Sequence, residues 1–399
     1  MNELRSLTGP LWFSYVEAVL TSLVVGFAEN YFAAFSLQQG LTALESGLLI
    51  SLPLIVAAVI QFFMQTKIKI IGLSHFVKRA LFIQSLSLLG LCFLSLVKSE
   101  YAFYFLFFFY AIYWLGHFSI QPAWNRWISD IIPLEQGQNY FSLRTRLSQI
   151  GIILGLFGGG FLLHLNVWSV SVDYLFLILF LSCFLLKVII IQLFNRHPEQ
   201  NEPLHLNIHH FKKLFLQNVQ FFKKYAIFNT SLFLSAPFVA GYLLSVRKVS
   251  YLDFMYIMAA LFVGKVAMTY ALSQFKKQFE PHQIMLWGGI VAAPLPVLWP
   301  YCRGIFDLCA VHFLSGLGWA AWEVGMSLNF FKKIDHTKKI EVVSLYNYIG
   351  VTTQVLGTVL GAILFNHFLK MSFDQLFIVA GIIRLIAVFG LRKPRLSAN

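Results

Sequence analysis

The residues in this chain that are best suited to chemistry are a few charged side chains set inside long apolar runs. Glu17 and Glu29 lie in the first of these runs, and Glu323 lies in a later one. A carboxylate at the centre of a bilayer costs several kcal/mol unless it faces water or a partner. We therefore expect each acid either to be a functional group on an aqueous route or to be held by a structural hydrogen bond.

The composition places these apolar runs in a membrane. Of the 399 residues, 58% are hydrophobic and 12% are charged, whereas soluble domains carry roughly 25% charged residues. Runs of about 20 apolar residues, enough to cross a hydrocarbon core of about 30 Å, predict helices, because lipid offers the backbone no hydrogen bonds. The sequence therefore predicts an all-α polytopic membrane protein with 12 transmembrane helices. They lie near 11–36, 45–66, 76–97, 101–125, 147–165, 170–194, 226–245, 250–272, 282–301, 305–330, 341–368 and 373–391.

The basic residues are unevenly distributed between the loops. The formal net charge is +13, and most of the 30 Lys and Arg residues fall on one side of the predicted spans. An excess of Lys and Arg marks the cytoplasmic loops of membrane proteins. The pattern therefore predicts that both termini are cytoplasmic, and it argues against nucleic acid as the partner of the positive charge.

Four short motifs recur at one constant spacing of 202 residues. A Leu-Gly pair alone is common in such a chain, but a shared register favours an internal duplication. The matches are Leu115-Gly116 with Leu317-Gly318, Ser142-Leu143 with Ser344-Leu345, Leu154-Gly155 with Leu356-Gly357, and Gly159 with Gly361. The duplication predicts two six-helix bundles, 1–194 and 226–399, joined by a cytoplasmic linker at 195–225. The same spacing matches Glu323 to Gln121, which predicts polar groups at equal depth in two related helices.

The linker carries an amphipathic pattern of its own. Its apolar residues recur at helical spacing beside four lysines, and they are Ile208, Phe211, Leu214, Phe215, Val219 and Phe222. This pattern is typical of a helix lying on an anionic lipid surface. The linker also holds His205, His209 and His210, but the other histidines are single and dispersed, so we expect no metal site. Nothing resembles a nucleotide-binding loop, and we expect no cofactor.

Twelve spans in two halves, with a basic turn after the second span, resemble the major facilitator superfamily of secondary transporters. The superfamily usually has Gly-x-x-x-Asp-Arg-x-Gly-Arg-Arg in this turn, of which the chain keeps Lys78-Arg79. A bacterial branch closes its fourth helix with Pro-Ala-Trp-Asn-x-Trp and then Asp and Pro, which is similar to residues 122–127, Asp130 and Pro133 here. The resemblance implies a multi-pass protein of the bacterial inner membrane, and we expect it to be a monomer.

Charged residues between the fourth and fifth spans form a candidate gate. Arg126, Asp130, Arg144 and Arg146, with Glu135, can form a cytoplasmic cluster that holds or releases these helices as the two halves rock. The alternative interpretation is a solvated charged turn.

A run of small residues in the fifth span has two interpretations. The stretch from Gly151 to Gly160 resembles the antiporter motif Gly-x-x-x-Gly-Pro-x-x-Gly-Gly, with Leu156 in place of the proline. The resemblance implies export. The alternative is that glycines at a spacing of four let two helices approach closely.

The resemblance also indicates which residues line a transport route. In the superfamily the cavity is lined mainly by spans 1, 4, 7 and 10, with Lys265 of the eighth span nearby in this chain. The implied lining residues are Glu17, Glu29, Asn30, His117, Gln121, Asn229, Ser235, Trp319 and Glu323. Three acids against one lysine favour proton binding by at least one acid, and a cationic, zwitterionic or amphiphilic substrate.

Taken together, the patterns predict a secondary active transporter that moves a small organic solute by alternating access, with proton coupling. Efflux and uptake both stay open, for a metabolite, a drug or a siderophore-like compound. An uncoupled facilitator or a lipid flippase of the same fold is the alternative. The sequence has no clustered nucleophile or His/Asp constellation, so an integral-membrane enzyme is not expected. The predicted partners are the solute, protons and membrane lipids.

Overall fold

The computed structural model describes residues 10–71, 73–131, 134–194, 215–274, 279–333, 339–365 and 371–392. Within these ranges the chain forms helices and turns and no strand. Eleven helical segments are long and apolar enough to cross a membrane. A further helix, α14 (Lys339–Ile363), occupies the predicted span near 341–368. The prediction of an all-α polytopic fold is confirmed.

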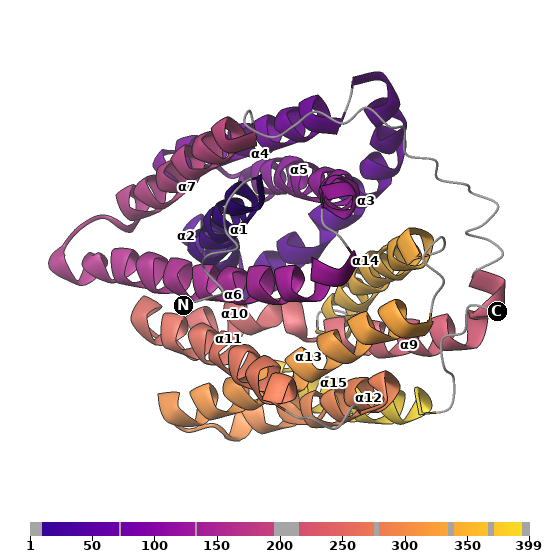
Figure 1. Ribbon diagram of the computed structural model, residues 1–399. Coiled ribbons are helices and arrows are strands. Elements are labelled where there is room, and N and C mark those ends of the chain that lie inside the picture. The colour runs from indigo at the N-terminus through magenta and orange to yellow at the C-terminus, as the bar shows by residue number, and fades with distance from the viewer. Residues whose placement is uncertain are drawn as a thin grey trace. The chain divides into compact units, whose positions relative to one another are not determined.

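The first compact unit contains the described residues up to 194 together with Lys248–Met255. In this unit α1 packs against α6 and α7, α4 packs against α5 and α7, and α3 packs against α5 (Figure 1). Its elements are α1 (Pro10–Phe27), η2 (Glu29–Tyr31), α2 (Phe32–Gln38), α3 (Ala43–Ile71), α4 (Leu73–Leu96), α5 (Ala102–Ile131), α6 (Leu134–His164), η3 (Leu165–Trp168) and α7 (Val172–Phe194).

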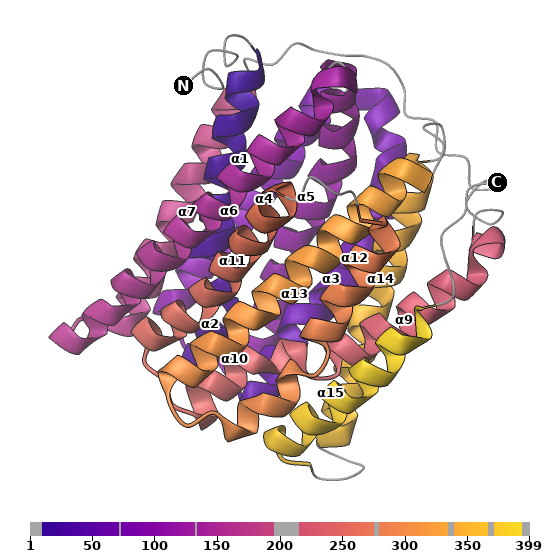
Figure 2. The same cartoon turned by 60° about the horizontal axis from the view of Figure 1, so that its bottom comes forward.

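The second unit contains the described residues 215–247 and those from 256 onward. In it α12 packs against α13, and α9 packs against α14 and α15 (Figure 2). Its further elements are α9 (Val219–Phe233), η4 (Ala236–Phe238), α10 (Val239–Gly241), η5 (Tyr242–Val246), most of α11 (Tyr251–Gln274), α12 (Pro281–Ala292), η6 (Leu295–Tyr301), α13 (Ile305–Lys333) and α15 (Phe373–Gly390).

The internal architecture of the two units repeats. In the first unit the opening helix is interrupted by the 3-10 turn at Glu29–Tyr31, and in the second the interruption is at Ala236–Phe238, 207 residues later. Gly155 of α6 lies against α1, and Gly357 of α14 lies against α9, at positions that are 202 residues apart. Matching breaks and matching contacts confirm the pseudo-symmetric pair of bundles that the 202-residue spacing predicts.

These two glycines provide the first test of the packing. We expect Gly155→Ala and Gly357→Ala each to destabilise the protein by about 1–3 kcal/mol. An added Cβ would lie 2.4 Å from the carbonyl oxygen of Leu23 and 2.3 Å from that of Thr230, so the helices must separate. Thermal unfolding in detergent measures the change. At Gly304 no atom lies within 4 Å of the added Cβ, so Gly304→Ala is the control. Equal unfolding temperatures for all three variants would contradict the expectation.

The end of the predicted linker belongs to a core helix. Helix α9 begins at Val219, and Phe221 and Phe222 are each 1% exposed in the aromatic core of the second unit. Residues 195–214, which include His205, His209 and His210 and the first half of the predicted amphipathic helix, lie outside the described residues. The boundaries of the linker and of the two bundles stay a prediction.

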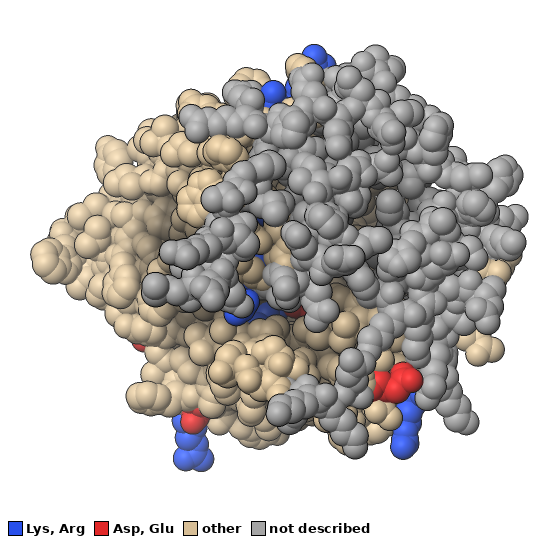
Figure 3. Space-filling model, in the orientation of Figure 1, with Lys and Arg blue, Asp and Glu red and all other residues tan. Residues whose placement is uncertain are grey.

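The described surface is suited to lipid. On the face shown in Figure 3, the described atoms are mainly uncharged. Large apolar side chains point outward on many helices, among them Phe108 at 56%, Trp287 at 67% and Ile386 at 69% exposure. Water disfavours such a surface, whereas acyl chains do not.

Candidate functional site

A buried ion pair joins the first and fifth spans of the N-terminal unit. The Arg144 Nη2 atom of α6 lies 2.8 Å from Glu17 Oε2 of α1, and the exposed fractions of the two side chains are 16% and 7%. The second guanidinium nitrogen, Nη1, donates to the carbonyl oxygen of Ser14 and, at 3.0 Å, to its hydroxyl. Thr21 donates to Glu17 Oε1 at 2.9 Å. The carboxylate is therefore held by one cation and one hydroxyl.

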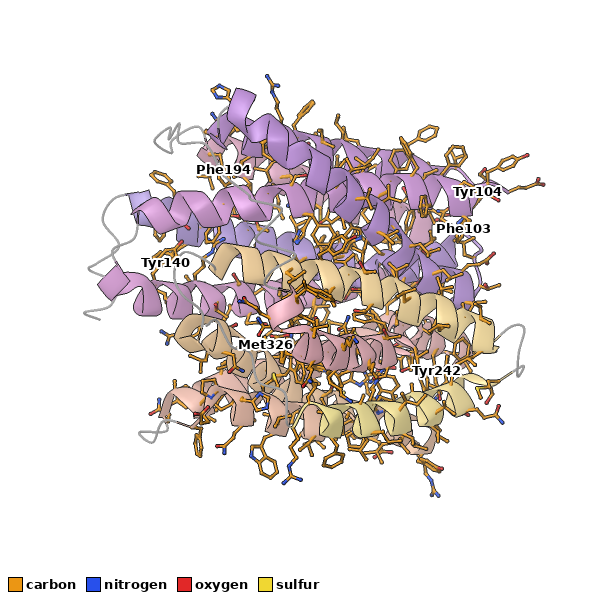
Figure 4. The ribbon with its side chains drawn as sticks, turned by 90° about the vertical axis from the view of Figure 1, so that its right-hand side faces the viewer. Phe103, Tyr104, Tyr140, Phe194, Tyr242 and Met326 are labelled. Atoms are coloured by element: carbon orange, nitrogen blue, oxygen red, sulfur yellow. The ribbon has the colours of Figure 1, made fainter. Side chains whose placement is uncertain are left out.

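Aromatic rings surround this ion pair. The guanidinium carbon of Arg144 lies 3.9 Å from the ring centroid of Trp124, a cation–π contact. The Tyr140 hydroxyl is hydrogen-bonded to Ser14, and the Tyr140 ring packs against Tyr15 with 5.1 Å between centroids. Figure 4 places Tyr140 toward one end of the first unit, away from Tyr104. Such a shell lowers the local dielectric and strengthens the attraction between the two charges.

The structure describes only some of the residues of the predicted cytoplasmic gate. Arg144 contacts Glu17 within the bundle, and Arg146 is exposed. The side chains of Arg126 and Asp130, and that of Glu135, lie outside the described residues, so the cytoplasmic cluster stays a prediction.

A second polar group of the N-terminal unit surrounds Glu29. The Tyr113 hydroxyl of α5 donates to Glu29 Oε1 at 2.6 Å, and Tyr113 is fully buried. Asn30 donates through its side-chain amide to the Val25 carbonyl at 2.9 Å, which satisfies a group at the end of α1. The polar pair Glu29-Asn30 thus coincides with a break in the helix.

His117 of α5 belongs to the same polar group. Its ring packs edge-on against Trp114, with 5.3 Å between centroids, and it interacts electrostatically with Glu29 and with Lys187 of α7. Sequence reasoning identified Glu29, Asn30 and His117 as candidates but missed Tyr113 and Lys187. Lys187 lies in an otherwise apolar span, and that was the available signal. Gln121 lies in α5, and its side chain is outside the described part.

In the C-terminal unit, the structure brings two predicted residues together. Lys265 Nζ of α11 lies 2.7 Å from Glu323 Oε1 of α13. The side chain of Lys265 is 17% exposed and that of Glu323 is 54% exposed, so the lysine is largely enclosed by the unit and the glutamate is open. Trp319 of α13 packs against Phe228 of α9 at 6.2 Å and against Trp322 at 6.4 Å between centroids. These contacts place Trp319 at the edge of the aromatic core.

Asn229 and Ser235, the remaining predicted lining residues, make structural hydrogen bonds in the second unit. Asn229 of α9 donates to the carbonyl of Gly350 and to Thr353, at 2.8 and 2.7 Å. Ser235 accepts a hydrogen bond from Arg384 at 2.7 Å. Among the described residues, no group of three or more His, Cys, Asp or Glu side chains is arranged to hold a metal ion.

The sequence profile of the Major Facilitator Superfamily matches residues 18–351 of the chain. The protein belongs to this superfamily. The helices, the repeated halves and the profile agree on a transporter fold in a multi-pass membrane protein rather than on an enzyme. The suspected resemblance is confirmed. No curated protein is close enough in sequence to give a significant match.

Solved structures share this fold at low sequence identity. The nucleoside transporter NupG aligns with a TM-score of 0.73 at 11% identity, covering 96% of this chain and 99% of its own. A D-xylose-proton symporter aligns with a TM-score of 0.72 at 13% identity, covering 97% and 98%. The human organic anion transporter MFSD10 (TETRAN) aligns with a TM-score of 0.65 at 12% identity, covering 96% and 98%. At these identities the likeness establishes the fold.

Proposed function

We propose that the protein is a proton-coupled secondary active transporter that moves a small organic solute across the bacterial inner membrane by alternating access. The observation that carries the proposal is the buried ion pair of Glu17 and Arg144 inside a chain of this superfamily. We propose that the protein works as a monomer with both termini in the cytoplasm. Its expected solutes are small cationic, zwitterionic or amphiphilic compounds, in either direction.

The chemistry of the ion pair favours Glu17 as the proton carrier. An arginine keeps its proton throughout the physiological range, whereas a carboxylate takes one up. Protonation of Glu17 removes the attraction between its carboxylate and Arg144, so the strength of the contact between α1 and α6 depends on the bound proton. A two-state contact of this kind couples proton binding to a movement of helices.

The other predicted residues have supporting parts in this proposal. Glu29 and Glu323 are further proton acceptors, and Asn30, His117, Gln121, Lys265 and Trp319 are polar or aromatic groups for the solute. One solved structure with the same fold is that of a D-xylose-proton symporter, which supports the proposal of proton coupling. The competing function, an uncoupled facilitator or a lipid flippase, predicts a flux that ignores the pH gradient.

Flux measurements on Glu17→Gln test the proposal. In vesicles loaded with a pH-sensitive dye, we expect solute-driven proton movement to fall by about tenfold or more, because glutamine binds no proton. A panel of nucleosides, pentoses and organic cations serves as the set of solutes. Exchange of solute in the absence of a pH gradient is expected to continue.

The matched control for this experiment is Glu45→Gln. Glu45 accepts hydrogen bonds from Thr42 at an exposed helix start and belongs to neither polar group of the first unit. We expect wild-type proton movement in this variant. Full proton movement in Glu17→Gln, with Glu29→Gln and Glu323→Gln equally active, would end the proposal of coupling.

A further inference from the structure

A lysine lies buried in the interior of the N-terminal unit. Lys187 of α7 is 2% exposed. Among the residues that the structure describes, it makes no hydrogen bond and no ion pair within 4.0 Å. Its helix packs against α1 and α4. An ammonium group in such a position is costly unless a carboxylate compensates its charge.

The compensating charge comes from Glu29. Glu29 exerts the stronger electrostatic influence on Lys187 and Glu17 the weaker, and neither carboxylate lies within 4.0 Å of the ammonium. Tyr113 donates to Glu29 at 2.6 Å, and His117 interacts with both Glu29 and Lys187. The titratable groups around Lys187 on all packed elements are Glu17, Glu29, Cys92, Tyr113, His117 and Cys183.

The polar interior continues onto α4. Both amide atoms of Gln84 are buried and have no hydrogen-bond partner within the described ranges. The Gln84 Cβ atom lies 2.7 Å from the position that a Cβ on Gly116 would take, and Gly116 is adjacent to His117 in α5. A buried amide without a protein partner is suited to an internal water molecule, which can pass protons between neighbouring groups.

The group around Lys187 differs from the ion pair of Glu17 and Arg144 in whether its basic residue can lose a proton. An arginine cannot release its proton, so only Glu17 changes charge in that pair. A buried lysine can release its proton. When neutral Lys187 takes up a proton from a hydronium ion, an O–H bond of the hydronium breaks, an N–H bond forms, and the summed charge of Lys187 and an ionised Glu29 changes from −1 to zero. The Glu29 carboxylate therefore favours the protonated lysine.

We propose that Lys187 and Glu29, together with Tyr113 and His117, form a second proton-exchange centre of the N-terminal unit, in which Lys187 is the group that takes up and releases the proton. The centre contains neither residue of the ion pair of Arg144 and Glu17. Its use in transport rests on the proposed function, but its proton binding is measurable without any solute.

Proton uptake by the purified full-length protein in detergent tests this centre. A pH-indicator dye in weakly buffered solution counts the protons bound when the pH is lowered from about 9.5 to about 5. We expect Lys187→Arg to bind about one proton fewer than the wild type, because arginine is already charged at the start. Lys98→Arg is the matched control, since Lys98 is half exposed and paired with Asp173, and it is expected to bind the wild-type number. A purely structural lysine would be replaced by arginine without any change in this number.

A second variant keeps the test valid if the larger arginine side chain prevents folding. Lys187→Met combined with Glu29→Gln removes both charges at once, and it is expected to fold and to bind at least about one proton fewer. Wild-type proton uptake by either folded variant would overturn the second centre. If uptake falls but flux ignores the pH gradient in every variant, the centre stands and the proposed coupling fails. If uptake is unchanged but Glu17→Gln loses coupled flux, the coupling stands and the centre fails.

Discussion

Replacing Arg144 by glutamine is expected to lower the free energy of unfolding by about 3–5 kcal/mol, because it removes one partner of a buried ion pair. Glu17 would lose its cationic partner at 7% side-chain exposure and keep the hydrogen bond from the Thr21 hydroxyl. Ser14 would lose both hydrogen bonds that Arg144 donates to it. Thermal unfolding of the purified protein in detergent measures the loss.

A double-mutant cycle separates the ion pair from the bulk of the arginine side chain. Combining Arg144→Gln with Glu17→Gln removes both charges, and we expect it to recover most of the lost stability. Arg146→Gln in the same helix is the control, since Arg146 is exposed and its loss should cost no more than about 0.5 kcal/mol. A double variant as unstable as the sum of the two single variants would show that the charges do not interact.

The second large effect is expected from Arg384→Met, which should destabilise the protein by about 2–4 kcal/mol. Arg384 of α15 is 3% exposed and donates to the carbonyl oxygens of Ser231 and Leu232, at 3.3 and 2.5 Å, and to the Ser235 hydroxyl at 2.7 Å. Helix α9 ends at Phe233, so these carbonyls belong to its last turn and have lost their helical partners. The guanidinium therefore replaces the hydrogen bonds that the break at Ala236–Phe238 removes.

The control for this variant is Arg392→Met, an exposed arginine just after the end of α15. It is expected to unfold at the wild-type temperature. A lysine in place of Arg384 offers a finer comparison, because one ammonium group cannot reach three acceptors with the geometry of a guanidinium. We expect Arg384→Lys to unfold between the wild type and Arg384→Met. An Arg384→Met variant as stable as the wild type would show that the carbonyls find other donors.

The fold was predictable because it depends on properties that are local in the chain. A run of 20 apolar residues predicts a membrane-spanning helix whatever surrounds it, since lipid satisfies no backbone group. The duplication was predictable for a similar reason, because Gly155 and Gly357 keep the register of the helix pairs that they allow to approach. The superfamily followed from the span count and the motifs around Pro122 and Trp127, and the profile match confirms it.

The candidate site was predictable only as a set of unusual residues. Glu17, Glu29 and Lys265 stand out because charges are rare inside apolar runs. The pairing of Lys265 with Glu323 is consistent with their assignment to one polar region. Arg144 was assigned to a cytoplasmic cluster instead, because it lies near the start of its span, beside other arginines.

The sequence by itself determined which segments enter the membrane, that they form two related halves, and which few charges lie within them. Only the tertiary structure decided which charges meet. Glu17 and Arg144 are 127 residues apart, and Glu29 of the first span acts electrostatically on Lys187 of the mostly apolar helix α7. The physical reason is that hydrophobicity positions a helix along the membrane normal but leaves its rotation free when all its faces are apolar. That rotation is set by close packing at small residues and by the few polar contacts themselves.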